Sequence, residues 1–172
     1  MSRDLKALIR NVPDFPIPGV QFKDITTLLR DGAAFQEVID RLVSHYQDQR
    51  VDVVVGVESR GFIFSAPVAY RLGAGLVPIR KPGKLPAATV EVEYDLEYGA
   101  NTLQIHADAF SPGARVLIVD DLLATGGTIG AAAELVKRLG GEIVGLAFVI
   151  ELTFLNGRER LRDYPIVSLI QF

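Results

Sequence analysis

Residues 115–150 have the sequence RVLIVDDLLATGGTIGAAAELVKRLGGEIVGLAFVI, and this stretch decides the fold class. It begins with the apolar run Arg115–Val119 and passes through a polar loop into a helical segment that ends near Leu139. It closes with the apolar run Glu142–Ile150. Continuous apolar runs of this length are typical of strands covered on both faces. Strand, helix and strand in this order predict a parallel pair joined by a right-handed crossover.

The same alternation continues on both sides of this stretch. Further strands are predicted at Val51–Val57, Leu76–Arg80 and Ile166–Ile170, with a helix that ends near Gly73 and a short one over Asn156–Arg162. Strands that alternate with helices predict an α/β fold with a mostly parallel twisted sheet flanked by helices. At this length we expect one domain over residues 1–172, because a domain usually takes ~100–200 residues.

The beginning of the chain departs from this alternation. A short helix capped by Ser2 is predicted over Ser2–Arg10. Residues 11–25, NVPDFPIPGVQFKDI, hold three prolines and a glycine among apolar side chains, which predicts an irregular loop folded over something. The apolar residues from Phe35 to Tyr46 recur at helical spacing and predict an amphipathic helix.

An antiparallel hairpin is predicted in the middle of the chain. Residues 90–98 and 103–107 alternate between apolar and polar side chains, and the turn is expected at Gly99–Asn101. Its acidic residues Glu91, Glu93 and Asp95 are interpreted as the solvated face of this hairpin.

The composition excludes several classes of protein. The chain of 172 residues has 18 Lys plus Arg against 21 Asp plus Glu, 49% hydrophobic residues and no Cys. These values exclude disorder, a collagen repeat, a disulfide scaffold and any Cys-ligated metal or thiol nucleophile. A net charge of −3 argues against nucleic-acid binding. The beginning of the chain lacks the apolar stretch of a secretory signal, and Ile143–Ile150 is too short to span a membrane, so we expect a cytoplasmic location.

The loop Asp120–Thr128 carries the chemistry. Gly126 and Gly127 allow successive N–H groups to converge on one point, and Thr125 and Thr128 add hydroxyls at the start of a helix. These features predict a phosphate site, and the absence of a Walker lysine predicts that the phosphate is held and not transferred. Asp120 and Asp121 can accept hydrogen bonds from a vicinal diol or hold a metal bound to it. The alternative is an ordinary strand-to-helix turn.

The block VLIVDDLLATGGT resembles the phosphoribosyl-pyrophosphate (PRPP) signature of the type I phosphoribosyltransferases. Over nearly the whole chain, the segments FPIPGVQFKDIT, GVESRGF, IRKPGKLP and LEYG are similar to the adenine branch of that family. The resemblance implies the type I fold with an N-terminal hood over about residues 1–30. It also implies transfer of ribose 5-phosphate from PRPP to N9 of adenine, giving AMP and pyrophosphate with Mg²⁺ in a homodimer.

The resemblance also assigns roles to residues. Asp120 and Asp121 are expected to bind the ribose, Ala124, Thr125, Gly126, Gly127 and Thr128 the 5′-phosphate, and Glu58, Ser59, Arg60, Arg80, Lys81 and Lys84 the pyrophosphate. Val20, Phe22 and Lys23 are expected to contact adenine. Glu97, Tyr98 and Arg60 are the expected catalytic residues, and Glu97 is expected either to accept the N9 proton or to orient the base. No side chain is assigned as a metal ligand, since Mg²⁺ suits the oxygens of PRPP and water.

Other interpretations of these residues stay open at this point. Arg60 can form a surface ion pair with Glu58, the three cations after the strand at 76–80 can form a solvated loop, and Phe22 and Val20 can pack the hood while Lys23 is merely exposed. His45 and His106 have no metal-spaced partner and are interpreted as structural. The alternative functions are transfer to a 6-oxopurine such as xanthine or guanine, and PRPP binding by a regulator without turnover.

Overall fold

The computed structural model describes residues 3–96 and 99–172. By their internal contacts they divide into two compact units, with the boundary between Arg41 and Leu42. This boundary lies further along the chain than the end of the predicted hood, near residue 30. Within the described residues, no helix has both the length and the apolar composition that crossing a membrane requires.

The second unit is built on a five-stranded sheet. The strands lie in the order β4 (Gly75–Ile79), β3 (Val53–Val57), β7 (Arg115–Leu123), β8 (Glu142–Glu151) and β9 (Ile166–Gln171). All four pairings are parallel. This confirms the predicted α/β fold with a parallel sheet, whose strands β3, β7 and β8 contain long apolar runs because both faces of the sheet are covered.

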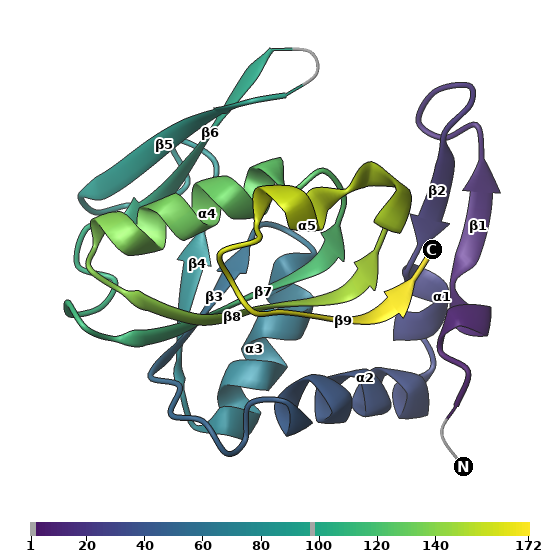
Figure 1. Cartoon of the computed structure of the whole chain (residues 1–172), viewed down its shortest axis with the longest axis horizontal. Coiled ribbons are helices and arrows are strands. Elements are labelled where there is room, and N and C mark those ends of the chain that lie inside the picture. Colours follow the sequence, from purple (N-terminus) through teal and green to yellow (C-terminus); the bar gives the residue numbers. More distant parts are fainter. Residues whose placement is uncertain (1–2, 97–98) are drawn as a thin grey trace. The chain divides into compact units, whose positions relative to one another are not determined.

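Helices α3 (Gly61–Leu72) and α4 (Gly127–Arg138) lie on opposite sides of this sheet (Figure 1). Side chains of β7, such as Val116 and Ile118, join those of α4, such as Leu135, in one core cluster. The predicted helix before Gly73 is confirmed, and Gly73 ends α3 in the left-handed conformation with φ of 65°. A 3₁₀ turn η2 (Thr153–Leu155) and the short helix α5 (Gly157–Arg160) follow β8.

The predicted hairpin is confirmed as strands β5 (Thr89–Asp95) and β6 (Ala100–His106), which pair antiparallel. The turn expected at Gly99–Asn101 is wrong, because Ala100 and Asn101 already belong to β6, opposite Asp95 and Tyr94. Val92 and Leu103 lie opposite each other and are buried in the core cluster. The acidic residues Glu91, Glu93 and Asp95 are exposed, as their alternation predicted.

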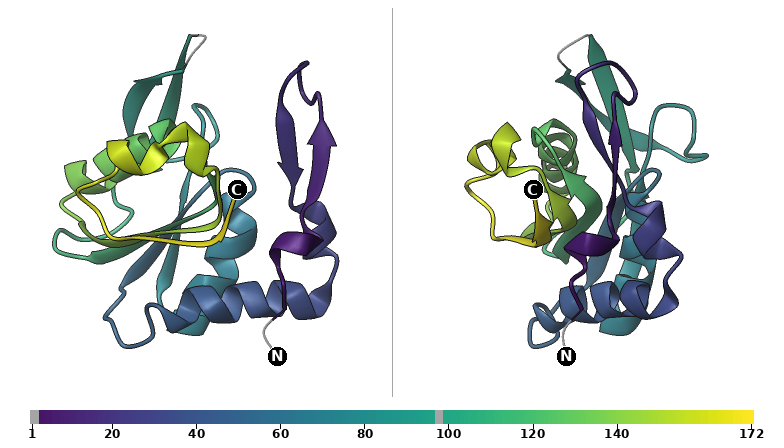
Figure 2. Two further views of the ribbon diagram at one scale, coloured as in Figure 1. Left: turned by 45° about the vertical axis from the view of Figure 1, so that its right-hand side comes forward. Right: turned by 90° about the vertical axis from the view of Figure 1, so that its right-hand side faces the viewer.

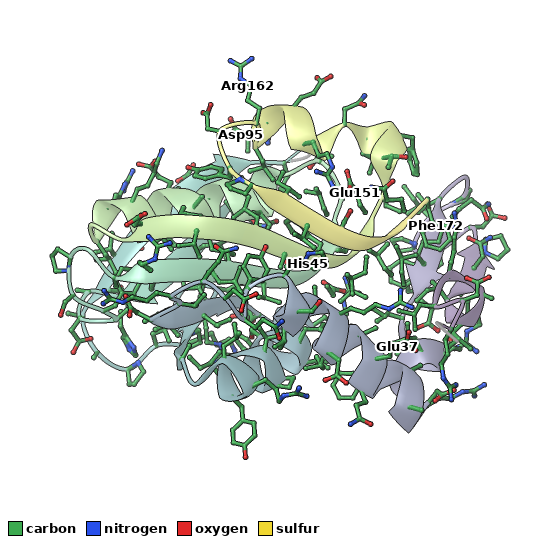
Figure 3. All side chains as sticks on the ribbon, turned by 60° about the horizontal axis from the view of Figure 1, so that its bottom comes forward. Glu37, His45, Asp95, Glu151, Arg162 and Phe172 are labelled. Atoms are coloured by element: carbon green, nitrogen blue, oxygen red, sulfur yellow. The ribbon has the colours of Figure 1, made fainter. Side chains whose placement is uncertain are left out.

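Strand β7 is longer than predicted. The expectation that it ends at Val119 is wrong, because β7 continues to pair with β8 as far as Leu123 opposite Glu151. Leu123 is buried, so the apolar side chains past the acidic pair still favour strand structure. Asp120 and Asp121 therefore lie within the sheet. The N–H of the last residue, Phe172, donates to the Glu151 carbonyl (3.0 Å), and the two residues are labelled in Figure 3.

The first unit differs from the prediction in two places. The prediction of a helix over Ser2–Arg10 is wrong, since the described residues there form a 3₁₀ turn η1 (Lys6–Leu8). The Asp4 carboxylate accepts hydrogen bonds from the N–H groups of Lys6 and Ala7 at the start of this turn. The irregular loop at 11–25 is wrong too. β1 (Arg10–Pro13) and β2 (Gln21–Asp24) form an antiparallel hairpin, visible in Figure 2. Pro13 ends β1 and the other prolines lie in the turn, where they remove no ladder hydrogen bond.

The remaining helices of this region are α1 (Thr26–Leu29) and α2 (Gly32–Ser44). α2 confirms the helix predicted from Phe35 onward, and its residues Val38 and Leu42 are fully buried.

Candidate functional site

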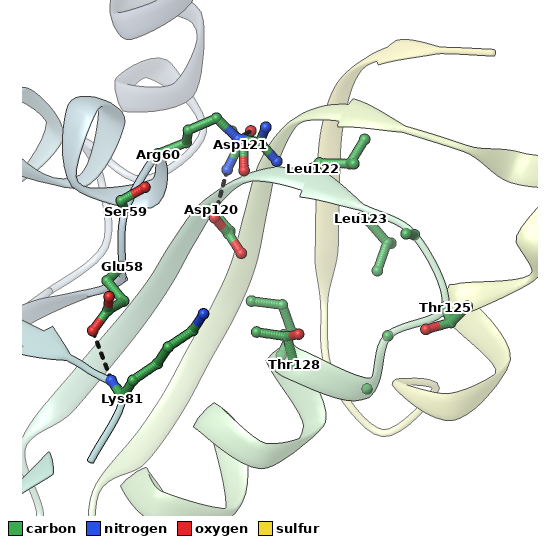
Figure 4. A pocket seen from close by; sticks show the side chains of 14 residues that line it. Glu58, Ser59, Arg60, Lys81, Asp120, Asp121, Leu122, Leu123, Thr125 and Thr128 are labelled. Carbon is green, nitrogen blue, oxygen red and sulfur yellow. Dashed lines mark hydrogen bonds and ion pairs between the residues drawn. The ribbon is translucent and has the colours of Figure 1, made fainter. Parts of the chain in front are cut away.

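A pocket of about 390 Å³ lies where β3, β4 and β7 reach their carboxyl ends (Figure 4). Ligands of open α/β sheets bind at this edge. Its lining comes from three segments that are far apart in the sequence: Glu58, Ser59 and Arg60 after β3, Lys81 after β4, and all residues from Asp120 to Ile129. The structure thus brings together the ribose, phosphate and most pyrophosphate residues that the sequence predicted.

Two neighbouring carboxylates, Asp120 and Asp121, share this pocket with the guanidinium of Arg60. Arg60 Nε lies 2.7 Å from Asp121 Oδ2. Asp121 is only 7% exposed, and its N–H donates to Asp120 Oδ1 (2.9 Å). Arg60 therefore pairs with the acidic end of β7, whereas Glu58 pairs with Arg80 (3.3 Å).

The ionised form of the Asp120 carboxyl is destabilised in this arrangement. Burial raises the pKa of its carboxyl well above the usual value, and the adjacent Asp121 carboxylate raises it further, although Arg60 acts in the opposite direction. A group that donates hydrogen bonds to Asp120 or neutralises its charge, such as a sugar hydroxyl or a cation, would relieve this cost. Space beside Asp120 is kept by Gly61, because a Cβ on Gly61 would lie 2.8 Å from Asp120 Oδ1.

The loop Ala124–Thr128 exposes backbone donors at the start of α4. Gly126 precedes the helix with φ of 84°, a conformation that favours glycine, and no described side chain caps the helix at this position. The helical hydrogen bonds begin with Gly130 N–H donating to Gly126 O (2.9 Å), so the N–H groups just before Gly130 have no partner within the helix. Together with the positive end of the helix dipole they suit a phosphate.

The predicted cations do not all reach the pocket. Lys81 lines it, and its N–H donates to the Glu58 carboxylate (2.7 Å; Figure 4). Arg80 lies over the Phe62 ring (5.9 Å) and against Glu58, and Lys84 is exposed in the following turn; neither lines the pocket. The Glu58 carboxylate thus pairs with the Arg80 side chain and accepts the Lys81 N–H. Glu58 could therefore contact an anion only through its backbone. The Glu58–Ser59 peptide bond is cis.

The predicted adenine residues belong to the β1–β2 hairpin of the first unit. Phe22 makes an edge-to-face contact with Phe15, with ring centroids 5.1 Å apart, and Val20 is partly exposed in the turn. Lys23 is partly exposed, and its Nζ donates a hydrogen bond to Asn11 Oδ1 (2.9 Å).

Glu97 and Tyr98 lie outside the described residues. His45 is exposed just beyond α2, and His106 Nε2 accepts a weak hydrogen bond from Ala87 N–H (3.4 Å). Across residues 3–96 and 99–172, no three His, Asp or Glu side chains gather as a metal site would need.

Three residues near the loop Ala124–Thr128, called the phosphate loop below after its predicted role, were missed by the sequence analysis. The Tyr94 hydroxyl lies 3.3 Å from Thr128 Oγ1. Arg160 Nη1 lies 3.1 Å from the position of a Cβ on Gly127, and Gly157 packs against the backbone of the loop. The rule that selected the other segments would have found Gly157, because this residue follows β8 at the same edge of the sheet.

Comparison with known proteins identifies the family of this chain. Residues 24–170 match the family model described as phosphoribosyl transferase domain. The adenine phosphoribosyltransferase of Chloroflexus aurantiacus is 73% identical over 170 residues, which cover 99% of this chain and 98% of that one. The chain therefore belongs to the phosphoribosyltransferase family, and within it to the adenine phosphoribosyltransferases, which confirms the resemblance drawn from the sequence.

Solved structures show the same fold. The crystal structure of adenine phosphoribosyltransferase from Thermoanaerobacter pseudethanolicus superposes with a TM-score of 0.95 at 54% identity, covering 98% of each chain. That of the Trypanosoma brucei enzyme, in complex with AMP, pyrophosphate and ribose-5-phosphate, has a TM-score of 0.89 at 26% identity, covering 99% of this chain and 82% of that one. The predicted type I phosphoribosyltransferase fold is thereby confirmed.

Proposed function

We propose that this protein transfers the ribose 5-phosphate group of PRPP to N9 of adenine, in purine salvage. The bond from C1 of the ribose to the pyrophosphate oxygen breaks, the bond from C1 to N9 forms, and the N9 proton leaves; the products are AMP and pyrophosphate. One observation carries the proposal: a single pocket joins an acidic pair, an arginine and the uncapped start of α4. Its relatives by sequence carry the name of this activity.

The sugar and its 5′-phosphate occupy the β7–α4 segment in this proposal. Asp120 and Asp121 accept hydrogen bonds from the two ribose hydroxyls. Such hydrogen bonds would stabilise the ionised Asp120 carboxylate, whose pKa is raised by burial and by Asp121. The N–H groups and hydroxyls of Ala124–Thr128 hold the phosphate. The relative from Trypanosoma brucei was crystallised with ribose-5-phosphate and AMP, which supports ligands of this shape.

The pyrophosphate lies on the β3 side of the pocket. Ser59, Arg60 and Lys81 line that side and offer a hydroxyl, a guanidinium and an ammonium group to a highly charged leaving group. The pocket offers two carboxylates side by side, a set that fits Mg²⁺ when substrate oxygens complete its shell. Bound in this way, Mg²⁺ would neutralise the charge that develops on pyrophosphate.

Adenine recognition and proton transfer are assigned by the family alone. We assign Val20, Phe22 and Lys23 to the base, with a backbone carbonyl that accepts from the 6-amino group, because a 6-oxopurine would leave such a carbonyl unpaired. Glu97 accepts the N9 proton or orients the base, and Tyr98 helps to close the site against water, which would otherwise hydrolyse PRPP.

The test is a comparison of bases. Purified protein, PRPP and Mg²⁺ are mixed with adenine, hypoxanthine, guanine or xanthine, and the nucleotide products are separated. AMP from adenine, with far less product from the others, is expected. Product from a 6-oxopurine alone would establish the first alternative function. PRPP binding without product in a single turnover would establish a non-catalytic regulator.

We also propose a cytoplasmic homodimer. Three large apolar side chains of the second unit support it: Ile63 and Tyr70 on α3 and Leu76 on the edge strand β4 are 39%, 85% and 45% exposed. A second copy would cover apolar surface that a monomer leaves in water. Sedimentation equilibrium is expected to give twice the chain mass, and Tyr70→Glu is expected to shift it toward the monomer.

A further inference from the structure

An ion pair between the buried Glu151 and the partly exposed Arg158 lies outside the pocket, at the end of β8. Glu151 is 3% exposed, and both its oxygens are used by Arg158 of α5: Nε lies 2.7 Å from Oε1 and Nη2 2.8 Å from Oε2. Ser168 of β9 also donates to Oε2. The bidentate geometry fixes the orientation of Arg158 relative to the sheet more tightly than a single contact would.

The residue next to Arg158 touches the phosphate loop through its backbone. Gly157 is buried, and a Cβ placed on it would lie 2.4 Å from the carbonyl oxygen of Ala124. In the other direction, a Cβ on Gly126 would lie 2.9 Å from the carbonyl oxygen of Gly157. The start of α5 and the loop Ala124–Gly126 therefore pack backbone to backbone, and neither can shift without the other.

Glu151 is itself fixed to the strand that leads into this loop. It lies opposite Leu123 in the β7–β8 register, and the next N–H, that of Leu152, donates to the Leu123 carbonyl (2.9 Å). The loop Ala124–Gly126 is therefore fixed from two sides, and both begin at the pairing of Leu123 with Glu151. On one side β7 leads directly into Ala124. On the other side Glu151 binds Arg158 and so fixes the neighbouring Gly157, which packs against Ala124.

Stability alone does not account for this pair. Burial raises the pKa of Glu151, and the hydrogen bonds from Arg158 and Ser168 outweigh that effect and leave the pKa below its usual value. The Arg158 side chain is 43% exposed, and solvent weakens the contribution of such a pair to stability, so the pair is better explained by the geometry that it fixes.

We propose that Glu151 and Arg158 are positioning residues for the 5′-phosphate of the substrate, acting through Gly157 on the loop Ala124–Gly126. Neither residue lines the pocket, so neither touches the ligand. The inference rests on the proposed function, because it takes Ala124–Thr128 as the phosphate site.

Glu151→Gln tests the proposal, since glutamine keeps the size of the side chain and removes the charge. Ribose 5-phosphate is titrated calorimetrically, and the KM values for PRPP and for adenine are measured separately. We expect the Kd for ribose 5-phosphate and the KM for PRPP to rise about tenfold, because a 1 Å displacement can cost up to ~100-fold. The KM for adenine is expected to change less than twofold.

Gly157→Ala provides a second variant that leaves the ion pair intact and pushes on Ala124 directly. It is expected to weaken ribose 5-phosphate binding in the same way, so the proposal can be tested even where Glu151→Gln does not fold. Asp52→Asn is the control: Asp52 also pairs with an arginine, Arg50 (2.9 Å), but it precedes β3 at the opposite edge of the sheet, and its variant should bind ribose 5-phosphate normally.

Two results would overturn the proposal. The first is normal ribose 5-phosphate binding by a folded Glu151→Gln or by Gly157→Ala. The second is an equal rise in both KM values, which would show a general loosening. Wild-type protein that forms AMP but does not bind ribose 5-phosphate would overturn the proposal and leave the transferase function standing; loss of both would overturn the function as well.

Discussion

The strands of the parallel sheet begin at one edge, called here the amino edge, and finish at the opposite one, the carboxyl edge. Both edges carry charged residues and a hollow of similar size, but their carboxylates differ in how well they are neutralised. At the amino edge a hollow of about 360 Å³ is lined by Arg50, Asp52 and residues 110–114. Asp52 accepts the N–H of Arg115 (2.9 Å) and pairs with Arg50 (2.9 Å). At the carboxyl edge Asp120 lies beside Asp121, and Arg60 forms an ion pair with Asp121 (2.7 Å).

The pKa shifts of the two edges have opposite signs. The N–H of Arg115 and the side chain of Arg50 lower the pKa of Asp52. Burial and the neighbouring Asp121 raise the pKa of Asp120. Volume therefore does not distinguish the two hollows, whereas charge balance does. The amino edge satisfies its own charges, whereas the carboxyl edge keeps a costly carboxylate that the proposed ligand would stabilise.

The largest effect is expected from removing both charges of the carboxyl edge. Asp120→Asn combined with Asp121→Asn should lower kcat/KM for PRPP by about a hundredfold or more, because the ribose loses its charged acceptors. The circular dichroism spectrum should stay that of the wild type. Unchanged kinetics would refute the role assigned to the acidic pair.

A smaller loss is expected from crowding the same edge. Gly61→Ala places a Cβ 2.8 Å from Asp120 Oδ1, so the carboxylate must move, and the KM for PRPP should rise about tenfold. Gly32→Ala is the matched control. Gly32 is likewise the first residue of a helix, and a Cβ there meets nothing within 4 Å. A KM that rises equally in both variants would contradict the geometric explanation.

The single variant Asp120→Asn should stabilise the protein without ligand while it weakens activity. At neutral pH the folded state bears the cost of an ionised Asp120, since its pKa is raised above the ordinary value of 3.8. Asparagine removes that cost, by about 1 kcal/mol in the free energy of unfolding. The gain should shrink as the pH falls toward 4, because Asp120 is then protonated in the folded state. Urea unfolding at several pH values measures it, and a destabilised variant would contradict the interpretation.

The smallest effect on activity is expected at the amino edge. Asp52→Asn should leave kcat/KM within about twofold of the wild type. Because the folded pKa of Asp52 lies below its unfolded value, its contribution is present at neutral pH and is lost as the pH falls through the folded pKa. The variant should therefore be less stable than the wild type at neutral pH, with a difference that disappears in acid. A stability change of the same sign as that of Asp120→Asn would break the comparison between the edges.

Most of the parallel sheet and the phosphate loop could be predicted because their signals are local. Apolar runs specify β3, β7 and β8, and the glycines and threonines of residues 125–128 specify a strand-to-helix turn with free donors. The N-terminal hairpin could not be predicted in this way. Its strands are four residues each and are separated by a turn that holds two prolines, and their pairing depends on contacts between residues such as Arg10 and Asp24.

The sequence also could not predict which of the three cations after β4 would line the pocket. Arg80, Lys81 and Lys84 are nearly adjacent along the chain, yet only Lys81 lines the pocket, because Glu58 and Phe62 hold Arg80 aside. Which cation faces the site depends on the register of β4 against its neighbours and on the turn that follows, and neither is encoded in spacing.

The sequence by itself determined the class of fold, the acidic pair followed by a glycine-rich turn, and the family to which these belong, since each depends on residues that are neighbours in the chain. Only the tertiary structure decided that Arg60 pairs with Asp121, that burial makes Asp120 costly to ionise, and that Gly157 supports the phosphate loop from behind. Pairing, burial and backbone contact depend on which distant segments meet at one edge of the sheet, and that meeting is settled when the strands assemble.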